Sequence, residues 1–253
     1  MQVARFSHAG QIAFGIVDDD ALVVLKGDPM FAGFDPTGQR VPLTDAVLLA
    51  PVIPRSKVVC VGRNYRAHAE EFGNEVPAEP MLFFKPNTSV IGPGDAIVLP
   101  AQSSQVEHEG ELAAVIGKVT KHVSEADALD HVFGYTIAND VTARDLQRAD
   151  GQWARAKGFD TFCPLGPTIS TDVSPEARLT VRVNGELRQD APITDMVHSV
   201  AAIIAYASAA FTLLPGDVVL TGTPAGVGPL GDGDTVEVAI DGLGVLSNPV
   251  RSR

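Results

Sequence analysis

Three glutamates occupy alternate positions in the stretch VEHEGELAAVIGK, which spans residues 106–118 and continues as an apolar run. In a β-strand successive side chains point to opposite faces, so Glu107, Glu109 and Glu111 would share one face. Buried carboxylates without a compensating charge are so costly that they take up a proton or pair with a cation. The stretch therefore indicates either a strand end exposed to solvent or a site that holds a cation.

A second strand-like segment, GYTIAND at residues 134–140, ends in another acid, Asp140. If the two strands are neighbours, the carboxylates of Glu109, Glu111 and Asp140 can meet at one point. Three carboxylates without cysteine or an obligatory histidine suit a hard cation such as Mg²⁺ or Mn²⁺, and suit Ca²⁺ less well in a catalytic role. These three residues are therefore candidate metal ligands.

The segment RNYRAHAEEF, residues 63–72, places His68 and Glu71 three positions apart, so a helix would bring them to one face. A carboxylate next to an imidazole fixes its tautomer and raises its basicity, which suits a general base that takes a proton from water. An exposed helix with an unrelated histidine and glutamate would give the same pattern. This segment alone leaves both interpretations open.

Three basic residues lie in otherwise apolar or loop-like surroundings. Arg63 follows an apolar strand, Lys85 follows MLFF, and Lys157 lies within ARAKGFDTF. Such residues are commonly solvated or paired with acids, but three of them beside a metal would form an anion-binding pocket. The loop TGTPAGVG at residues 221–228 lacks the Gly-Lys-Ser/Thr ending of a phosphate-binding loop, so the sequence gives little support to nucleotide binding.

Short segments rich in Val, Ile and aromatic residues dominate the chain and must position these side chains. Residues 2–26 alternate strand-like runs with turns, which predicts a small β-meander. Residues 27–57 are rich in loop formers, so we expect a boundary near residue 54, with domains at 1–54 and 55–253. Many strands and few helical segments after this boundary predict an α+β fold on a mixed or antiparallel sheet.

Individual segments give more detailed expectations. Asn184-Gly185 predicts a tight hairpin turn between two strands. The strand-like segments are KVVCVG, MLFF, AIVLP, ELAAVIG, GYTIAND, LTVRV, VVLTG and TVEVAI. The helix-like segments are RAHAEEF, SEADALDHV, ARDLQRADGQWARA and MVHSVAAIIAYASAAF.

Composition narrows the functional classes. The 253 residues are 45% hydrophobic, enough for a large core, and carry a formal charge of -12. This charge disfavours nucleic acid and anionic membranes as partners, and allows an anionic substrate only where a local cationic site overrides it. The N-terminal segment lacks the apolar stretch of an export signal, and segment 200–214 is shorter than a membrane span. We therefore expect a cytoplasmic protein in which Cys60 and Cys163 are buried and form no disulfide.

Six motifs occur in an order and at a spacing that resemble the fumarylacetoacetate hydrolase family: GRNYRAHAEE, FFKPNTSVIGPG, EHEGELAAVIGK, GYTIANDVTARDLQ, KGFDTFCPLGP and TGTPAGVG. The resemblance covers about residues 55–250 and points to the branch of acylpyruvases and 2-hydroxyhepta-2,4-diene-1,7-dioate isomerases. It implies an α+β fold in which a mixed β-roll catalytic domain is combined with a small N-terminal β domain. It also implies a homodimer.

The resemblance assigns metal ligands residue by residue. Glu109 and Glu111 match the family's E-x-E-L motif, and Asp140 matches the acid of its ND-x-TARD motif. These residues would hold Mg²⁺ or Mn²⁺, with Ca²⁺ as an ion that could replace them in crystals. Glu107 is left outside the direct ligands or at the surface.

The resemblance also assigns catalytic and substrate-binding residues. His68 and Glu71 match the family's water-activating dyad on a mobile lid, and residues 69–80 carry the turn formers that a flexible lid needs. Lys157 matches a lysine that assists at the metal-bound oxygens. The positions that match substrate contacts are Arg63, Tyr65, Lys85, Gln147 and Thr223.

These assignments imply an enzyme that acts on a small anionic 2-oxo acid. Our first expectation is metal-dependent hydrolysis of a C–C bond in a 2,4-dioxo acid, such as an acylpyruvate or fumarylpyruvate, through an enolate. His68, held by Glu71, would take a proton from water, and Lys157 would stabilise negative charge. The alternatives are isomerisation of a 2-hydroxyhepta-2,4-diene-1,7-dioate in aromatic catabolism, decarboxylation of oxaloacetate, and a metal-stabilised binding protein without enzymatic activity.

Overall fold

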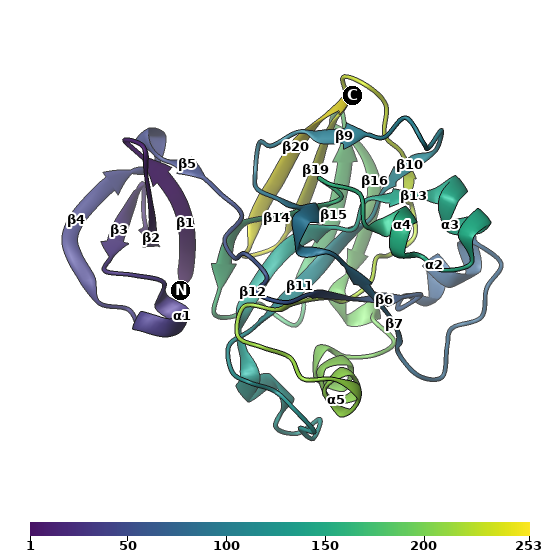
Figure 1. The fold of residues 1–253 in the computed structure, drawn as a ribbon, viewed down its shortest axis with the longest axis horizontal. Coiled ribbons are helices and arrows are strands. Elements are labelled where there is room, and N and C mark those ends of the chain that lie inside the picture. The colour runs from purple at the N-terminus through teal and green to yellow at the C-terminus, as the bar shows by residue number, and fades with distance from the viewer.

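An antiparallel meander forms the N-terminal part of the chain, and it was predicted from the alternating apolar residues there. The computed structural model describes all residues from Met1 to Arg253, and Figure 1 shows the meander, in purple, beside the larger part of the molecule. Phe6, Leu22 and Val41 are buried in its small core. Its elements are β1 (Gln2–His8), β2 (Gln11–Asp18), β3 (Ala21–Leu25), α1 (Pro29–Ala32), β4 (Pro36–Pro42) and β5 (Val47–Leu48).

The largest sheet has twelve strands and continues from the meander into the rest of the chain, because β1 pairs with β14. Its order is β4-β3-β2-β1-β14-β12-β11-β17-β6-β7, with β5 paired to β1 and β8 to β14. Two parallel pairs, β17–β6 and β14–β8, make this sheet mixed. The further strands are β6 (Val58–Gly62), β7 (Met81–Lys85), β8 (Val90–Ile91), β11 (Gly110–Ile116), β12 (Val132–Asn139), β14 (Cys163–Ser170) and β17 (Val218–Leu220).

Two smaller sheets complete the β structure. A five-stranded sheet packs on part of the large sheet, and residues such as Leu112, Ile137, Leu179 and Val238 form the core between them. A three-stranded sheet lies where the EHEGE stretch begins. The strands are β9 (Ile97–Leu99), β15 (Arg178–Val183), β16 (Glu186–Pro192), β19 (Thr235–Ile240) and β20 (Gly244–Ser252) in the first sheet, and β10 (Val106–His108), β13 (Thr142–Ala143) and β18 (Gly228–Pro229) in the second.

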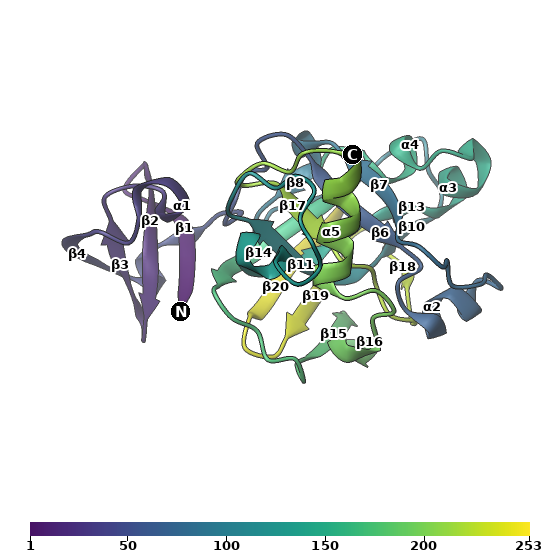
Figure 2. The ribbon, with the colours of Figure 1, turned by 90° about the horizontal axis from the view of Figure 1, so that it is seen from below.

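One longer helix, α5, covers another part of the large sheet, and Figure 2 shows it lying across the strands. It begins after Ser199, whose hydroxyl accepts a hydrogen bond from the N–H of Ala202 at 3.1 Å, as a helix N-cap does. No helix combines the length and apolarity that a membrane crossing requires. The helices are α2 (Arg66–Glu71), α3 (Arg144–Asp150), α4 (Ala154–Lys157) and α5 (Val200–Ala210), and the 3-10 turns are Leu43–Asp45, Asn87–Ser89, Ala128–His131 and Ile193–Asp195.

The predicted fold class, α+β with a mixed sheet and a small N-terminal β domain, is confirmed. Each predicted strand is present, and Asn184-Gly185 forms the hairpin turn, with both residues at positive φ. The expected helix over SEADALDHV is wrong apart from the 3-10 turn at Ala128–His131. The expected helix around ARDLQRADGQWARA is two helices, α3 and α4, because the chain turns at Gly151 with φ 68°. Cys60 and Cys163 are free and buried, as expected.

Asp217 fixes the start of the two central parallel strands, β6 and β17. Its buried carboxylate accepts hydrogen bonds from Ser56 Oγ at 2.8 Å, Lys57 Nζ at 2.8 Å and the Leu214 N–H at 2.9 Å. Burial opposes ionisation of Asp217, but the hydrogen bonds from Lys57, Leu214 and Ser56 outweigh it and lower the pKa of the carboxyl. This cluster therefore holds β6, the strand that leads to Arg63, against the centre of the sheet.

We expect Asp217→Asn to lower the free energy of unfolding by about 2 kcal/mol near pH 7, because hydrogen bonds to a charged acceptor are lost. The lowered pKa means that Asp217 stabilises the fold above the unfolded-state pKa of about 3.9, and that this contribution disappears as the pH falls through the folded-state pKa. Thermal denaturation from about pH 2.5 to pH 7 measures the difference from the unsubstituted protein. Asp130→Asn, at an exposed acid, is the control, and a difference that does not shrink in acid would contradict the prediction.

Candidate active site

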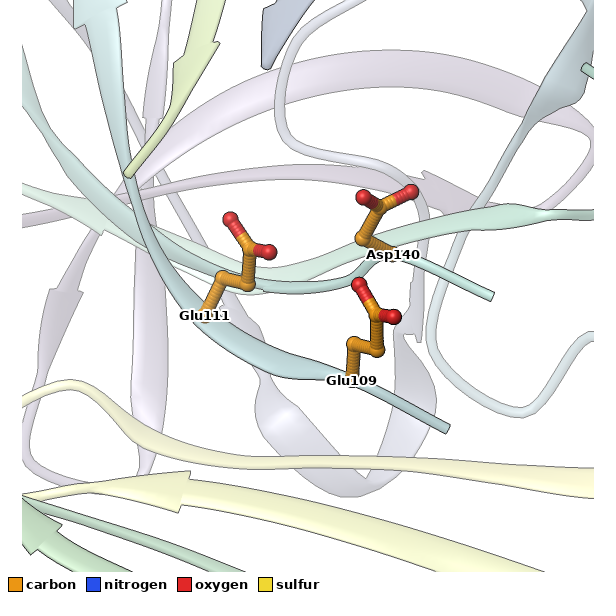
Figure 3. Close-up of side chains that lie close together, drawn as sticks. All are labelled: Glu109, Glu111 and Asp140. Carbon is orange, nitrogen blue, oxygen red and sulfur yellow. The ribbon is translucent and has the colours of Figure 1, made fainter. Parts of the chain in front are cut away.

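The carboxylates of Glu109, Glu111 and Asp140 meet at one point of the large sheet. Strands β11 and β12 are antiparallel, and their register pairs Gly110 with Asn139, so the residues beside this pair are neighbours. The N–H of Asp140 donates to the Glu109 carbonyl at 2.8 Å, and carboxylate oxygens of all three acids lie within 4.8 Å of one another. Figure 3 shows the three side chains pointing toward a common space, and none is more than 4% exposed. This burial excludes the interpretation of the EHEGE stretch as a strand end exposed to solvent.

Two buried lysines are paired with these acids. The ammonium of Lys157 lies 2.6 Å from Glu109 Oε2 and 2.6 Å from Asp140 Oδ2, and therefore bridges two of the three carboxylates. Lys85 approaches Asp140 from the other side, with Nζ 2.5 Å from Oδ1. Burial lowers the pKa of Lys157, but Asp140 and Glu109 outweigh it and raise the pKa above its usual value. Lys157 is therefore a cation in this site.

Arg144 is a component that the sequence analysis missed. Its guanidinium donates to Glu107 Oε2 at 2.7 Å, to Glu109 Oε1 at 2.6 Å and to Gln147 Oε1 at 2.7 Å. Glu107 is consequently buried, at 6% exposure, and lies behind the three converging acids. The only signal in the sequence was the position of Arg144 in the TARD part of the ND-x-TARD motif that also contains Asp140.

The charges of this cluster do not balance. Four buried carboxylates, including Glu107, face three buried cationic side chains, so full ionisation leaves one negative charge. Glu111 is the acid without a cationic partner, since its one hydrogen bond comes from the Gly222 N–H at 2.6 Å. Burial and the charges of Asp140 and Glu109 raise its pKa well above the usual range. A further cation beside Glu111 would supply the positive charge that this acid lacks.

The donor set fits a divalent metal. All three candidate ligands are carboxylates, which hard cations such as Mg²⁺ and Mn²⁺ prefer. The ammonium of Lys157 shows that the space between Glu109 and Asp140 accepts a positive charge. The triad of Glu109, Glu111 and Asp140 can therefore hold a divalent metal ion.

His68 and Glu71 form a pair beside this triad. His68 is buried at 8% exposure, and its Nδ1 lies 3.2 Å from Glu71 Oε2. Glu71 in turn accepts a hydrogen bond from the Gly226 N–H at 3.2 Å, which ties α2 to the loop 221–228. Burial lowers the pKa of His68, although Glu109 and Glu71 oppose this effect. The imidazole is therefore neutral near pH 7 and able to accept a proton.

Most of the residues predicted to be catalytic, substrate-binding or metal-binding line one cavity of about 300 Å³. Its wall also includes Arg148, Trp153 and Asn74, which the sequence analysis did not single out. Lys85 and Tyr65 do not line it: Lys85 lies behind Asp140, and the Tyr65 hydroxyl is buried without a hydrogen-bond partner. Glu71 stands behind His68. The predicted residues in the wall are Arg63, His68, Glu109, Glu111, Asp140, Gln147, Lys157 and Thr223.

Comparison with known families agrees with this site. A profile described as "Fumarylacetoacetate (FAA) hydrolase C-terminal" matches residues 57–251. The chain belongs to the fumarylacetoacetate hydrolase family. Residues 1–51 match a second family, described as "Rv2993c-like, N-terminal". This match confirms the resemblance to the family that the six motifs indicated. Members of the fumarylacetoacetate hydrolase family are enzymes.

Named relatives show which activities occur in this family. The mitochondrial oxaloacetate tautomerase fahd2 of Xenopus laevis is 49% identical over 216 residues, covering 80% of this chain and 68% of the relative. The crystal structure of a 2-hydroxyhepta-2,4-diene-1,7-dioate isomerase from Mycobacterium marinum is 48% identical, covers 100% of this chain and 99% of that one, and has a TM-score of 0.92. A 5-carboxymethyl-2-hydroxymuconate delta-isomerase from Mycobacterium smegmatis is 46% identical, covers 100% of both chains, and has a TM-score of 0.93.

We expect Glu111→Gln to weaken Mn²⁺ binding by more than about 100-fold, because loss of a ligand should exceed the roughly 10–100-fold that loss of a ligand's hydrogen-bond partner costs. Electron paramagnetic resonance of free Mn²⁺ during titration measures the affinity. Glu107→Gln removes a carboxylate of the same buried cluster but no oxygen of the triad, and should have the smaller effect. If Glu107→Gln loses the metal and Glu111→Gln retains it, the ligand assignment is wrong.

Proposed function

We propose that this protein is a metal-dependent enzyme that transfers a proton at the carbon next to the ketone of a 2-oxo acid, as a tautomerase or isomerase. The observation that carries this proposal is the cavity in which the acidic triad, Lys157 and His68 lie together. A base, a fixed cation and a divalent-metal site are the groups that formation of an enol from a 2-oxo acid requires. The names of relatives that are 46–49% identical support the same class of reaction.

His68 is the base in this proposal. With Nδ1 donating to Glu71, the imidazole keeps a lone pair on Nε2, which can accept the proton from the substrate carbon. Glu71 holds the ring orientation, and the Gly226 N–H holds Glu71. The pair thus fixes both the tautomer and the direction of the accepting atom.

Lys157 is the fixed cation. Glu109 and Asp140 hold its Nζ at the wall of the cavity, where the ammonium can stabilise negative charge on a substrate oxygen. When bound at the triad, a divalent ion would supply Lewis-acid stabilisation of the charge that develops on the 2-oxo oxygen. We propose Mg²⁺ or Mn²⁺ for this position, since both prefer carboxylate oxygens.

The second candidate is hydrolysis of a C–C bond in a 2,4-dioxo acid, the activity that the sequence analysis placed first. The pairing of His68 with Glu71 favours it, because the same neutral imidazole can take a proton from water. Decarboxylation of oxaloacetate needs the stabilised enolate but no activated water. We put hydrolysis second because the relatives named above, at 46–49% identity, are a tautomerase and two isomerases.

The biological setting belongs to the same proposal. A small anionic 2-oxo acid is the expected partner, and the charge of -12 disfavours nucleic acid and membranes. We propose a cytoplasmic homodimer, the assembly that the resemblance to the family implies. Sedimentation of the purified protein measures whether it dimerises.

The protein loaded with Mn²⁺ should accelerate the interconversion of enol and keto oxaloacetate, followed by the ultraviolet absorbance of the enol. His68→Gln should lower this rate by on the order of 10²–10⁴-fold, because the general base is lost. Glu71→Gln should lower it less, and Glu70→Gln, at the exposed neighbour, is the matched control and should not change it. Hydrolysis of acetylpyruvate without any effect on oxaloacetate would select the second candidate instead.

A further inference from the structure

Two arginines at the cavity differ from the other cations of the site. Arg144, Lys85 and Lys157 are each paired with carboxylates of the protein. Arg63 and Arg148 also line the cavity, but neither has a carboxylate partner anywhere in the chain. In a protein with a formal charge of -12, two guanidinium groups without an acid at the wall of one cavity are free to bind an external anion.

The backbone holds Arg63 in place. Its φ of 59° is in the left-handed region, which a side chain such as arginine rarely adopts, so the surrounding structure must fix it. Asn64 provides this fixation, since its Nδ2 donates to the carbonyls of His198 and Thr221 at 3.0 and 2.7 Å, and its Oδ1 accepts from the His198 N–H at 2.8 Å. The Arg63 side chain makes no hydrogen bond with the protein, so the strained position serves no internal contact of that side chain.

Arg148 is available because nearby acids are engaged elsewhere. On its own helix, Asp145 binds Ser103 Oγ at 2.6 Å, and Asp150 forms an ion pair with Arg155. The one hydrogen bond of the Arg148 side chain goes to the neutral amide oxygen of Gln105. A guanidinium has five N–H donors, so most of those of Arg148 are free for another acceptor.

We propose that Arg63 and Arg148 bind the distal carboxylate of a 2-oxo dicarboxylate, and so select dicarboxylates over monocarboxylates of the same length. This inference rests on the proposed function, in which the 2-oxo end of the substrate faces Lys157 and the acidic triad. Lys157 and the triad would then recognise the reacting group, while these arginines in the same cavity wall recognise a second negative charge. Guanidinium groups bind carboxylates with charge-assisted hydrogen bonds, which a terminal methyl group cannot form.

Trp153 supplies a reporter for this subsite. It is the only tryptophan of the chain and lines the same cavity. Gly62, the residue before Arg63, leaves room for the indole, because a Cβ at position 62 would lie 2.7 Å from Trp153 Cζ3. The tryptophan fluorescence of the protein therefore comes from the wall beside Arg63 and can follow binding without turnover.

The test compares two five-carbon 2-oxo acids, 2-oxoglutarate and 2-oxopentanoate, which differ in a distal carboxylate against a methyl group. Fluorescence titration of the 253-residue protein loaded with Mn²⁺ should give at least about tenfold tighter binding of 2-oxoglutarate than of 2-oxopentanoate. Arg148→Gln and Arg63→Gln should each reduce this preference several-fold. Arg155→Gln removes the same charge outside the cavity wall and should retain the preference.

The outcomes separate the subsite from the reaction. Equal binding of both acids by the unsubstituted protein, no binding of 2-oxoglutarate at millimolar concentration, or an unchanged preference in both arginine variants would overturn the subsite. Loss of the preference for 2-oxoglutarate in these variants supports the subsite, whether or not the protein turns over oxaloacetate. If the preference is lost in the variants but the unsubstituted protein does not turn over oxaloacetate, the proposed function is wrong and the subsite is still supported. Circular dichroism confirms that each variant is folded.

Discussion

The burial of several carboxylates at one point of a β-sheet is the constraint on which the rest of this structure depends. An isolated buried charge is prohibitively costly, so the fold must bring cations to the same place. They arrive from three separate elements: Lys85 from the end of β7, Arg144 from the start of α3 and Lys157 from the end of α4. Each of these elements is therefore held at the site by charge as well as by packing.

This constraint explains how very short helices can be part of a precise site. Helices α3 and α4 have seven and four residues, too few to be stable alone in water. Arg144 ties α3 to Glu107 and Glu109, and Lys157 ties α4 to Glu109 and Asp140, so the acids of the central strands fix both helices. Removal of a carboxylate from this cluster would thus disturb the wall of the cavity as well as the metal site.

The sequence predicted what depends on local periodicity and missed what depends on tertiary pairing. The alternation of residues placed Glu109 and Glu111 on one face, and the strand ending at Asp140 supplied the third acid. The ordered motifs gave the family and the fold class, and both are confirmed. Arg144 was missed because no pattern links it to Glu107, 37 positions away. Strands β14 and β20 were missed because their prolines contradict a strand pattern, although both strands pair with neighbours on each side. The boundary near residue 54, the role of each site residue and the hydrolytic chemistry stay predictions.

The uncompensated charge at Glu111 connects the metal site to the choice of substrate. With all four carboxylates ionised against three cations, the buried cluster would carry one negative charge, and the raised pKa of Glu111 shows that this state is unfavourable without a further cation. A divalent ion beside Glu111 would change this balance to one positive charge, and a 2-oxo acid would then be attracted to a protein that is strongly acidic overall. The acids whose charges oppose one another in this cluster are thus the same groups that, with a metal, would make it favourable to an anion. Selectivity for a second carboxylate on the substrate must then come from cations that are not paired with the acids of this cluster. Arg63 and Arg148 are the two such residues in the cavity wall, since neither forms an ion pair with an acid of the protein.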